Sequence, residues 1–125
     1  MKTINTDKAP AAIGPYVQAK QFGNLIFTSG QICLLPDGSL LQGTVEEQTA
    51  QVFKNLSEVL KAGGSSLQQV IKTTVFIKDM NDFGKINAVY EKAFGDHKPA
   101  RSCVEAARLP KDVLVEIECI ATTEV

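Results

Sequence analysis

The sequence PARSCVEAARLPKDVLVEIE, residues 99–118, places charged side chains on two segments with the composition of β-strands. A turn at residues 110–112 separates the segments, so this stretch predicts a hairpin of residues 101–107 with residues 113–121. A purely structural hairpin needs only alternating apolar and polar residues. An arginine, a cysteine and several carboxylates on these strands therefore indicate a chemical site as well as a sheet.

The second segment divides its residues between two faces. One face is an apolar row that we expect to pack against helices: Val113, Val115, Ile117, Cys119 and Ala121. The other face carries Leu114, Glu116, Glu118 and Ile120. A four-residue turn puts Arg101, Cys103 and Glu105 on this second face, because the register one residue off would push charges into the core. Glu105 then lies opposite Glu116, which raises one pKa if both carboxylates lose water.

Residues 45–62 have the pattern of an amphipathic helix. Thr44 and Glu47 have the spacing of a capping box, in which each side chain accepts a hydrogen bond from a backbone N–H at the helix start. Gly63-Gly64 provides the C-terminal stop. The sequence therefore predicts one helix over residues 45–62.

Strand segments lie on both sides of this helix. Residues 17–31 predict two strands joined at residues 23–24, and the Pro-Asp-Gly sequence at residues 36–38 predicts a chain reversal. Residues 70–78, VIKTTVFIK, are rich in β-branched side chains and predict a further strand.

A second helix begins at Asn81 or Asp82, either of which can cap it, and ends at Gly95. Its apolar face carries Phe83, Ile86, Val89, Tyr90 and Phe94. The resulting order, ββ-α-β-α-ββ, predicts a single α+β domain over residues 1–125 with both helices on one face of the sheet. The other sheet face needs either water or a partner.

Charge and hydropathy exclude several classes of protein. The 13 basic and 14 acidic residues are interspersed and give a formal net charge of -1, so no basic stripe is available to bind nucleic acid. The N-terminus lacks the apolar stretch of a signal peptide, and no apolar run approaches the roughly 18 residues that span a membrane. We expect a cytoplasmic protein.

The sequence also lacks the usual motifs for metals and nucleotides. Cys33, Cys103 and Cys119 cannot all pair within one chain and form no C-x-x-C unit, so reduced thiols are expected. The single histidine, His97, lies in no metal-binding motif, and no glycine-rich phosphate loop is present. We expect no metal and no cofactor.

Taken singly, the polar residues of the hairpin have ordinary structural explanations. Arg101 alone is better explained by a surface ion pair with Glu105 or Glu118, and Glu116 alone by a solvated strand position. Cys103 is more often a small hydrophobic residue than a nucleophile, and no nearby base is evident. In addition, the hairpin register holds Arg101 and Glu116 several residues apart, so a small substrate that touches both requires two copies of the chain.

Taken together, four segments resemble the RidA family, also called YjgF: APAAIGPYVQA (9–19), TSGQI (28–32), KTTVFIKDMNDF (72–83) and HKPARSCVEAARLPKDVLVEIE (97–118). The resemblance covers nearly the whole chain and is most specific in its last quarter. It implies a chorismate-mutase-like fold, a homotrimer with barrel-like assembly and active sites at the subunit clefts. It also implies an imine deaminase that hydrolyses 2-iminopropanoate and 2-iminobutanoate to 2-oxo acids and ammonia, without a cofactor.

The resemblance also implies residue roles. Arg101 matches the arginine that binds the substrate carboxylate, and Glu116 matches the acid that positions the hydrolytic water. Cys103 matches a position that contacts the imine nitrogen through its backbone. The remaining residues that match the lining of the pocket are Tyr16, Ser29, Gly30 and Asn87.

Two other functions remain compatible with these residues. The same pocket could bind a 2-oxo acid and serve a sensing or protein-binding regulator without catalysis. A ribonuclease activity, suggested for some relatives, fits poorly with the balanced charge and the absence of a basic groove rich in aromatic residues.

Overall fold

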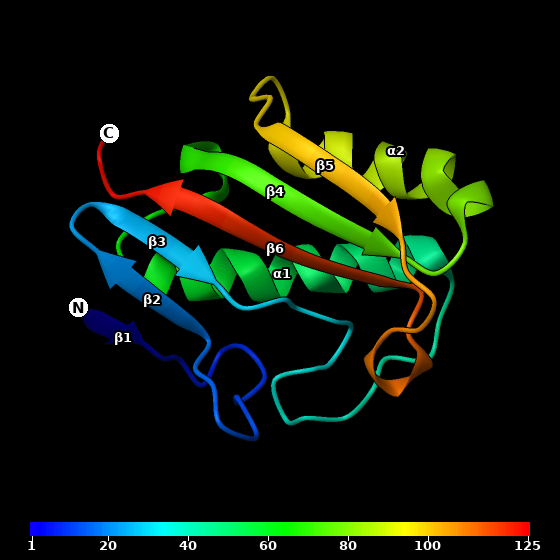
Figure 1. Ribbon diagram of the computed structural model, residues 1–125, viewed down its shortest axis with the longest axis horizontal. Helices are drawn as coiled ribbons and strands as arrows, with labels where there is room; N and C mark the ends of the chain where they lie inside the picture. Colours follow the sequence, from blue (N-terminus) through cyan, green and yellow to red (C-terminus); the bar gives the residue numbers. More distant parts are fainter.

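The computed structural model describes residues 1–125 and consists of one mixed sheet with two helices on one of its faces. Its strands are β1 (Lys2–Ile4), β2 (Ala19–Phe22), β3 (Leu25–Thr28), β4 (Val70–Ile77), β5 (Ala100–Glu105) and β6 (Val115–Thr122). The helices are α1 (Val45–Ala62) and α2 (Phe83–Phe94), with short 3-10 turns at Leu67–Gln69, Met80–Asp82 and Pro110–Asp112. The strand order is β1-β2-β3-β6-β4-β5, and both helices lie behind the sheet in Figure 1. Neither helix is long and apolar enough to cross a membrane.

Helix α1 begins and ends where its sequence signals predict. The backbone N–H of Glu47 donates to Oγ1 of Thr44 at 3.2 Å, and the N–H of Thr44 donates to Oε1 of Glu47 at 2.9 Å. Both bonds of the capping box are therefore present. Helix α2 also has nearly the predicted bounds, but the predicted cap by Asn81 or Asp82 is wrong: Asp82 is the N-cap residue and its side chain makes no capping hydrogen bond. The side chain of Asp79 accepts from the N–H of Asn81 and caps the preceding 3-10 turn.

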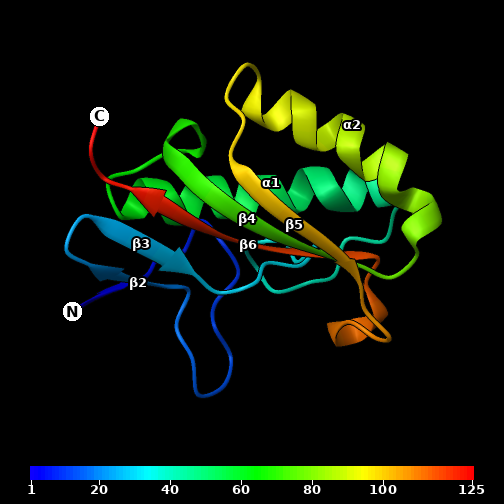
Figure 2. The same ribbon diagram turned by 45° about the horizontal axis from the view of Figure 1, so that its top comes forward.

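Strand β5 pairs with β4 and not with β6. The β4–β5 pair is parallel, whereas β6 lies between β3 and β4 and is antiparallel to both. The predicted hairpin of residues 101–107 with residues 113–121 is therefore wrong. A parallel pair needs a crossover connection, and α2 supplies it between β4 and β5, as Figure 2 shows. Both edges of β6 are already occupied, which leaves β5 at the edge of the sheet.

Because β5 pairs with β4, Arg101, Cys103 and Glu105 lie on the helix-facing side of the sheet. The prediction that they share a face with Glu116 is therefore wrong. In the register, Arg101 aligns with Thr73 and Cys119, Cys103 with Val75 and Ile117, and Glu105 with Ile77 and Val115. Arg101 and Glu105 remain exposed because β5 is the edge strand. Oε1 of Glu105 accepts from the N–H of Met80 at 2.8 Å, so the expected Glu105–Glu116 pair does not form.

The main core lies between the sheet and the helices, and a smaller cluster lies at one end of the sheet. Val115, Ile117, Cys119 and Ala121 belong to the main core, as predicted. Val113 instead joins the smaller cluster with Cys33 and Leu109, and Leu114 packs against the main core. The predicted alternation fails at these two residues because they precede β6, where the chain is not yet a strand.

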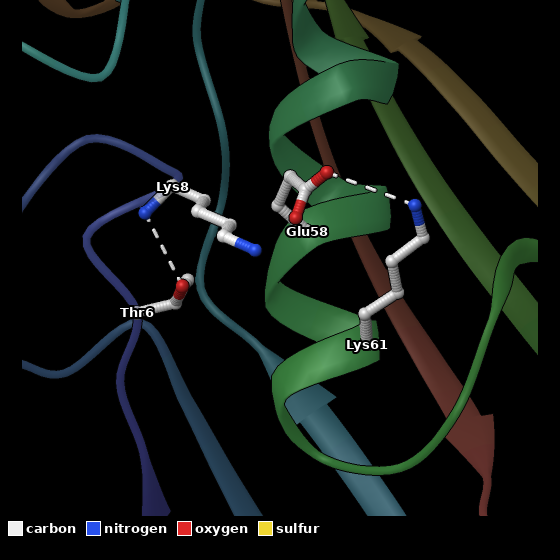
Figure 3. Close-up of polar contacts among 4 residues, drawn as sticks. All are labelled: Thr6, Lys8, Glu58 and Lys61. Atoms are coloured by element: carbon white, nitrogen blue, oxygen red, sulfur yellow. Dashed lines mark hydrogen bonds and ion pairs between the residues drawn. The ribbon is translucent and has the colours of Figure 1, made fainter.

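The N-terminal segment adds β1, a strand that the sequence pattern did not reveal. The buried Gln18 side chain holds this segment: its Oε1 accepts from the N–H of Thr6 at 2.8 Å, and its Nε2 donates to the carbonyl of Pro10 at 2.8 Å. Figure 3 shows Lys8 extending toward α1, where Glu58 and Lys61 form an ion pair at 3.7 Å. That pair lies within α1, so the polar anchor of the N-terminal segment is the Gln18 amide.

Replacing Thr44 by alanine removes one bond of the capping box, and we expect the free energy of unfolding to fall by about 1 kcal/mol. Thr44→Ser keeps the hydroxyl and serves as the matched control. Urea-induced unfolding followed by circular dichroism measures both variants. Equal stability of Thr44→Ala and the unaltered protein would contradict a stabilising role for the cap.

Candidate functional site

Arg101 is held in one orientation by helix α2. Its Nη1 donates to Oδ1 of Asn87 at 2.7 Å, and its guanidinium carbon lies 4.7 Å from the ring centroid of Tyr90 and 5.3 Å from that of Phe83. No carboxylate lies within ion-pair distance of Arg101, since the chain contains only the pairs Lys61–Glu58 and Arg108–Asp112. The remaining N–H donors of the guanidinium can therefore bind an anion.

A cavity of about 450 Å³ opens beside Arg101, between α2 and the start of β5. Asn87 and Tyr90 line it from the helix, and His97 and Lys98 line it from the loop that follows. The ring of His97 is fixed because its Nε2 lies 2.6 Å from the carbonyl oxygen of Val70. Arg101 and Lys98 line this cavity together with one acidic residue, Glu91, so positive charge predominates and favours a negatively charged group.

Glu116 lies on the opposite face of the sheet and is half-buried. Burial raises the pKa of its carboxyl, and the negative charge of Glu118 raises this pKa further. Its side chain rests against Gly30, where an added Cβ would collide with Oε2 and lie 2.9 Å from the carboxyl carbon. The close approach of this carboxyl to the backbone therefore requires glycine at position 30.

A second cavity, of about 310 Å³, surrounds Glu116 and Gly30. Tyr16 lines it with an exposed ring, and Ile32 and Pro110 contribute apolar surface. Ser29 does not line this cavity: its Oγ donates to the carbonyl of Val17 at 2.5 Å, and its N–H donates to the carbonyl of Gln18 at 2.9 Å. Its role in the chain is to fix the segment that carries Tyr16.

Cys103 has the properties of a structural cysteine. Its side chain is partly buried at the edge of the main core. Burial raises the pKa of the thiol, although the nearby charge of Arg101 opposes this shift. A protonated thiol without an adjacent base is a poor nucleophile, so any role of Cys103 in chemistry falls to its backbone. The chain contains no cluster of His, Cys, Asp or Glu suited to a metal ion.

The candidate site residues thus form two groups. Arg101, Asn87 and Cys103 lie on the helix side of β5, whereas Glu116, Gly30 and Tyr16 lie on the other side of the sheet. The two cavities have no lining residue in common. One chain therefore places Arg101 and Glu116 at two separate cavities on opposite faces of the sheet.

Sequence reasoning missed the two aromatic rings beside Arg101. Phe83, Asn87 and Tyr90 have the spacing i, i+4, i+7, which places them on one face of a helix. That spacing was visible in the sequence. It could not be connected to Arg101, because the hairpin prediction placed β5 beside β6 and away from α2.

Comparisons with known proteins agree along the whole chain. A family model described as endoribonuclease L-PSP matches residues 6–123. The 2-iminobutanoate/2-iminopropanoate deaminase of Escherichia coli strain K12 is 52% identical over 123 residues, which cover 96% of each chain. Among solved structures, the YjgF gene product of E. coli has a TM-score of 0.94 at 50% identity, covering 99% of this chain and 100% of that one. E. coli TdcF with bound serine has a TM-score of 0.94 at 47% identity, with the same coverage.

Replacing Glu118 by glutamine removes the negative charge that opposes ionisation of Glu116, and we expect the pKa of Glu116 to fall. Glu105→Gln is the control, because Glu105 lies on the other face of the sheet and should leave this pKa unchanged. Titration of the side-chain carboxyl carbons by NMR measures both. A pKa of Glu116 that stays the same in Glu118→Gln would disprove the electrostatic coupling.

Proposed function

We propose that this chain, which belongs to the endoribonuclease L-PSP family (the YjgF/RidA/RutC family), hydrolyses 2-imino acids such as 2-iminobutanoate and 2-iminopropanoate to 2-oxo acids and ammonia. Relatives that bear the name of this deaminase are about 52% identical to the chain and support a hydrolase-type enzyme. The observation that carries the proposal is an arginine without an ion-pair partner, oriented by Asn87, together with a half-buried carboxyl of raised pKa at Glu116.

Arg101 binds the carboxylate of the substrate in this proposal. Its planar guanidinium can donate two parallel hydrogen bonds to a carboxylate, and each charge-assisted bond contributes roughly 1.5 to 3 kcal/mol. The bond to Asn87 occupies one N–H and leaves other donors of the fork available. The carboxylate thereby fixes the adjacent imine carbon in position.

Glu116 transfers the protons of the hydrolysis. As a carboxylate it accepts a proton from water while the water oxygen bonds to the imine carbon. It then returns this proton to the imine nitrogen as the C=N double bond becomes a single bond, which regenerates the carboxylate. The tetrahedral intermediate then collapses: the C–N bond breaks, the hydroxyl proton moves to the departing nitrogen, and a C=O bond forms. The products are the 2-oxo acid and ammonia. A raised pKa suits this role because the same group must both accept and return a proton near neutral pH.

The backbone of Cys103 contacts the imine nitrogen in this mechanism. Strand β5 pairs with β4 along one edge only, so part of its backbone has no partner within the sheet. Such groups can donate to or accept from a ligand, whereas the thiol itself remains protonated.

A homotrimer brings the two groups of residues together in this proposal. Arg101 and Glu116 lie on opposite sheet faces of one chain, so a substrate that contacts both must lie between two protomers. Apolar side chains exposed on the strands, including Phe27 and Val104, provide surface for such contacts. Each subunit cleft then holds one complete site, with Tyr16, Gly30 and Asn87 around the substrate and Ser29 supporting Tyr16.

A sensing role is the second candidate, and the relative with bound serine favours it. Recognition of a small amino-acid carboxylate by Arg101 needs no catalysis. Saturable binding of a 2-oxo acid by a protein that accelerates no imine hydrolysis would favour the sensor. The endoribonuclease in the family description is less well supported, since the formal net charge of -1 provides no basic surface for RNA.

Glu116→Gln removes the proton acceptor, and we expect the rate of imine hydrolysis to fall by about 10² to 10⁴. A pyridoxal-phosphate-dependent dehydratase generates the imine, and semicarbazone formation measures how much imine survives. In the unaltered protein the rate should fall as the pH decreases through the raised pKa of Glu116, because only the carboxylate accepts a proton. In Glu118→Gln, this fall in rate should occur at lower pH, because the pKa of Glu116 is lower there.

Cys103→Ala is the control in the same assay and should keep the rate within about twofold, as expected if only its backbone takes part. Full activity of Glu116→Gln would overturn the proposed role of this residue.

Arg101→Ala should weaken substrate binding by about 10- to 100-fold, as expected for the loss of one strong charge-assisted hydrogen bond or more. Arg101→Lys should restore little of this loss, since an ammonium group cannot form two parallel bonds. Arg108→Ala is the matched control, because Arg108 is an exposed arginine that pairs with Asp112. Initial rates over a range of imine concentrations give KM and kcat, and an unchanged KM in Arg101→Ala would contradict carboxylate binding at this position.

A further inference from the structure

The ring of Tyr90 lies directly beside the guanidinium of Arg101, at 4.7 Å between the ring centroid and the guanidinium carbon. Arg101 is otherwise exposed, and an exposed arginine normally samples many rotamers. Attraction between a cation and the face of an aromatic ring favours the rotamers that keep the two in contact. The ring therefore limits where the guanidinium can lie.

Tyr90 is itself held on several sides. Its hydroxyl lies 2.7 Å from Oγ1 of Thr73, in a hydrogen bond between two buried side chains. Phe53 packs edge-on against its ring at 5.6 Å, and Phe94 packs at 4.8 Å. Burial raises the pKa of the phenol, so the group stays neutral. The ring is consequently a rigid part of the core that reaches the surface at Arg101.

An aromatic ring orients an arginine without neutralising it. A carboxylate in this position would accept hydrogen bonds from the guanidinium N–H groups. It would also neutralise the positive charge that attracts the substrate carboxylate. The ring attracts the cation through its face, so the N–H groups in the guanidinium plane stay free. Asn87 accepts from one of them and adds no charge.

We propose that Tyr90 is a positioning residue, whose ring, fixed by Thr73, Phe53 and Phe94, holds Arg101 ready to bind the substrate carboxylate. The consequence for catalysis rests on the proposed deaminase function. The orientation of Arg101 in the free protein does not depend on that function. The positioning role of Tyr90 and the deaminase function can therefore be tested separately.

Tyr90→Leu removes the ring, and Tyr90→Phe keeps it while removing the hydroxyl. We expect Tyr90→Leu to raise KM for the imine and Kd for 2-oxobutanoate about 5- to 30-fold, the range of a cation–π contact. Its kcat should change much less, because Glu116 is untouched. Tyr90→Phe should remain within about threefold of the unaltered protein, since only the hydrogen bond to Thr73 is lost.

Phe53→Leu is the control for a purely structural role. Phe53 packs on Tyr90 within the same aromatic cluster but does not contact Arg101. If Phe53→Leu raises Kd as much as Tyr90→Leu does, the effect comes from general loosening of the core and the proposal fails. If Tyr90→Leu does not fold, Tyr90→Met also removes the aromatic face while keeping a long apolar side chain, and it should raise Kd in the same direction. An unchanged Kd in a folded Tyr90→Met protein would then overturn the proposal.

The Nε–Hε signal of Arg101 in NMR spectra gives a readout that does not depend on activity. Ring currents should shift this signal upfield in the unaltered protein, and we expect it to move downfield in Tyr90→Leu and clearly less in Phe53→Leu, which keeps the Tyr90 ring beside Arg101. An unchanged signal in a folded Tyr90→Leu protein would overturn the proposal. If the unaltered protein neither binds 2-oxobutanoate nor hydrolyses imines, the deaminase function fails, while this signal still decides whether Tyr90 orients Arg101.

Discussion

The arrangement of the whole molecule depends on β6, an interior strand with an apolar face. Val115, Ile117, Cys119 and Ala121 fill the space between the sheet and the helices, and burial of such side chains is the main favourable term in folding. Because strand side chains alternate, this requirement sends Glu116 and Glu118 to the opposite face. Because β3 and β4 occupy both edges of β6, β5 can pair only with the free edge of β4.

The two groups of functional residues follow from these constraints. At the edge of the sheet, Arg101 can lie on the helix side without being buried, and there it meets the exposed end of a ring that belongs to the core. Glu116 faces a side that the helices do not cover, where the approach to Gly30 shields it partly from water. Shielding of this kind raises the pKa of the Glu116 carboxyl.

The sequence predicted those parts of the molecule that local signals determine. Helix α1 has a capping box and a terminal glycine, so its bounds could be read from neighbouring residues. The partner of β5 could not be predicted in this way. The choice between β4 and β6 depends on which long-range pairing forms more backbone hydrogen bonds and buries more apolar surface. The roles of Arg101 and Glu116 came from the family resemblance. The face of Glu116 was predicted correctly from the alternation along β6, while the face of Arg101 was misassigned because it follows from the pairing of β5. Tyr90 was correctly predicted as a core residue, and its contact with Arg101 became visible only with β5 beside α2.

Separation of Arg101 from Glu116 has a chemical advantage in the proposed assembly. If the two side chains were in contact within one chain, they would form a direct ion pair, which would occupy the arginine and lower the pKa of the acid. With each residue fixed on its own side of a rigid sheet, their distance is set by how two protomers dock. The gap can then match the length of a substrate that carries a carboxylate at one end and an imine carbon beside it. The acid keeps its raised pKa, and the arginine keeps its charge for the substrate.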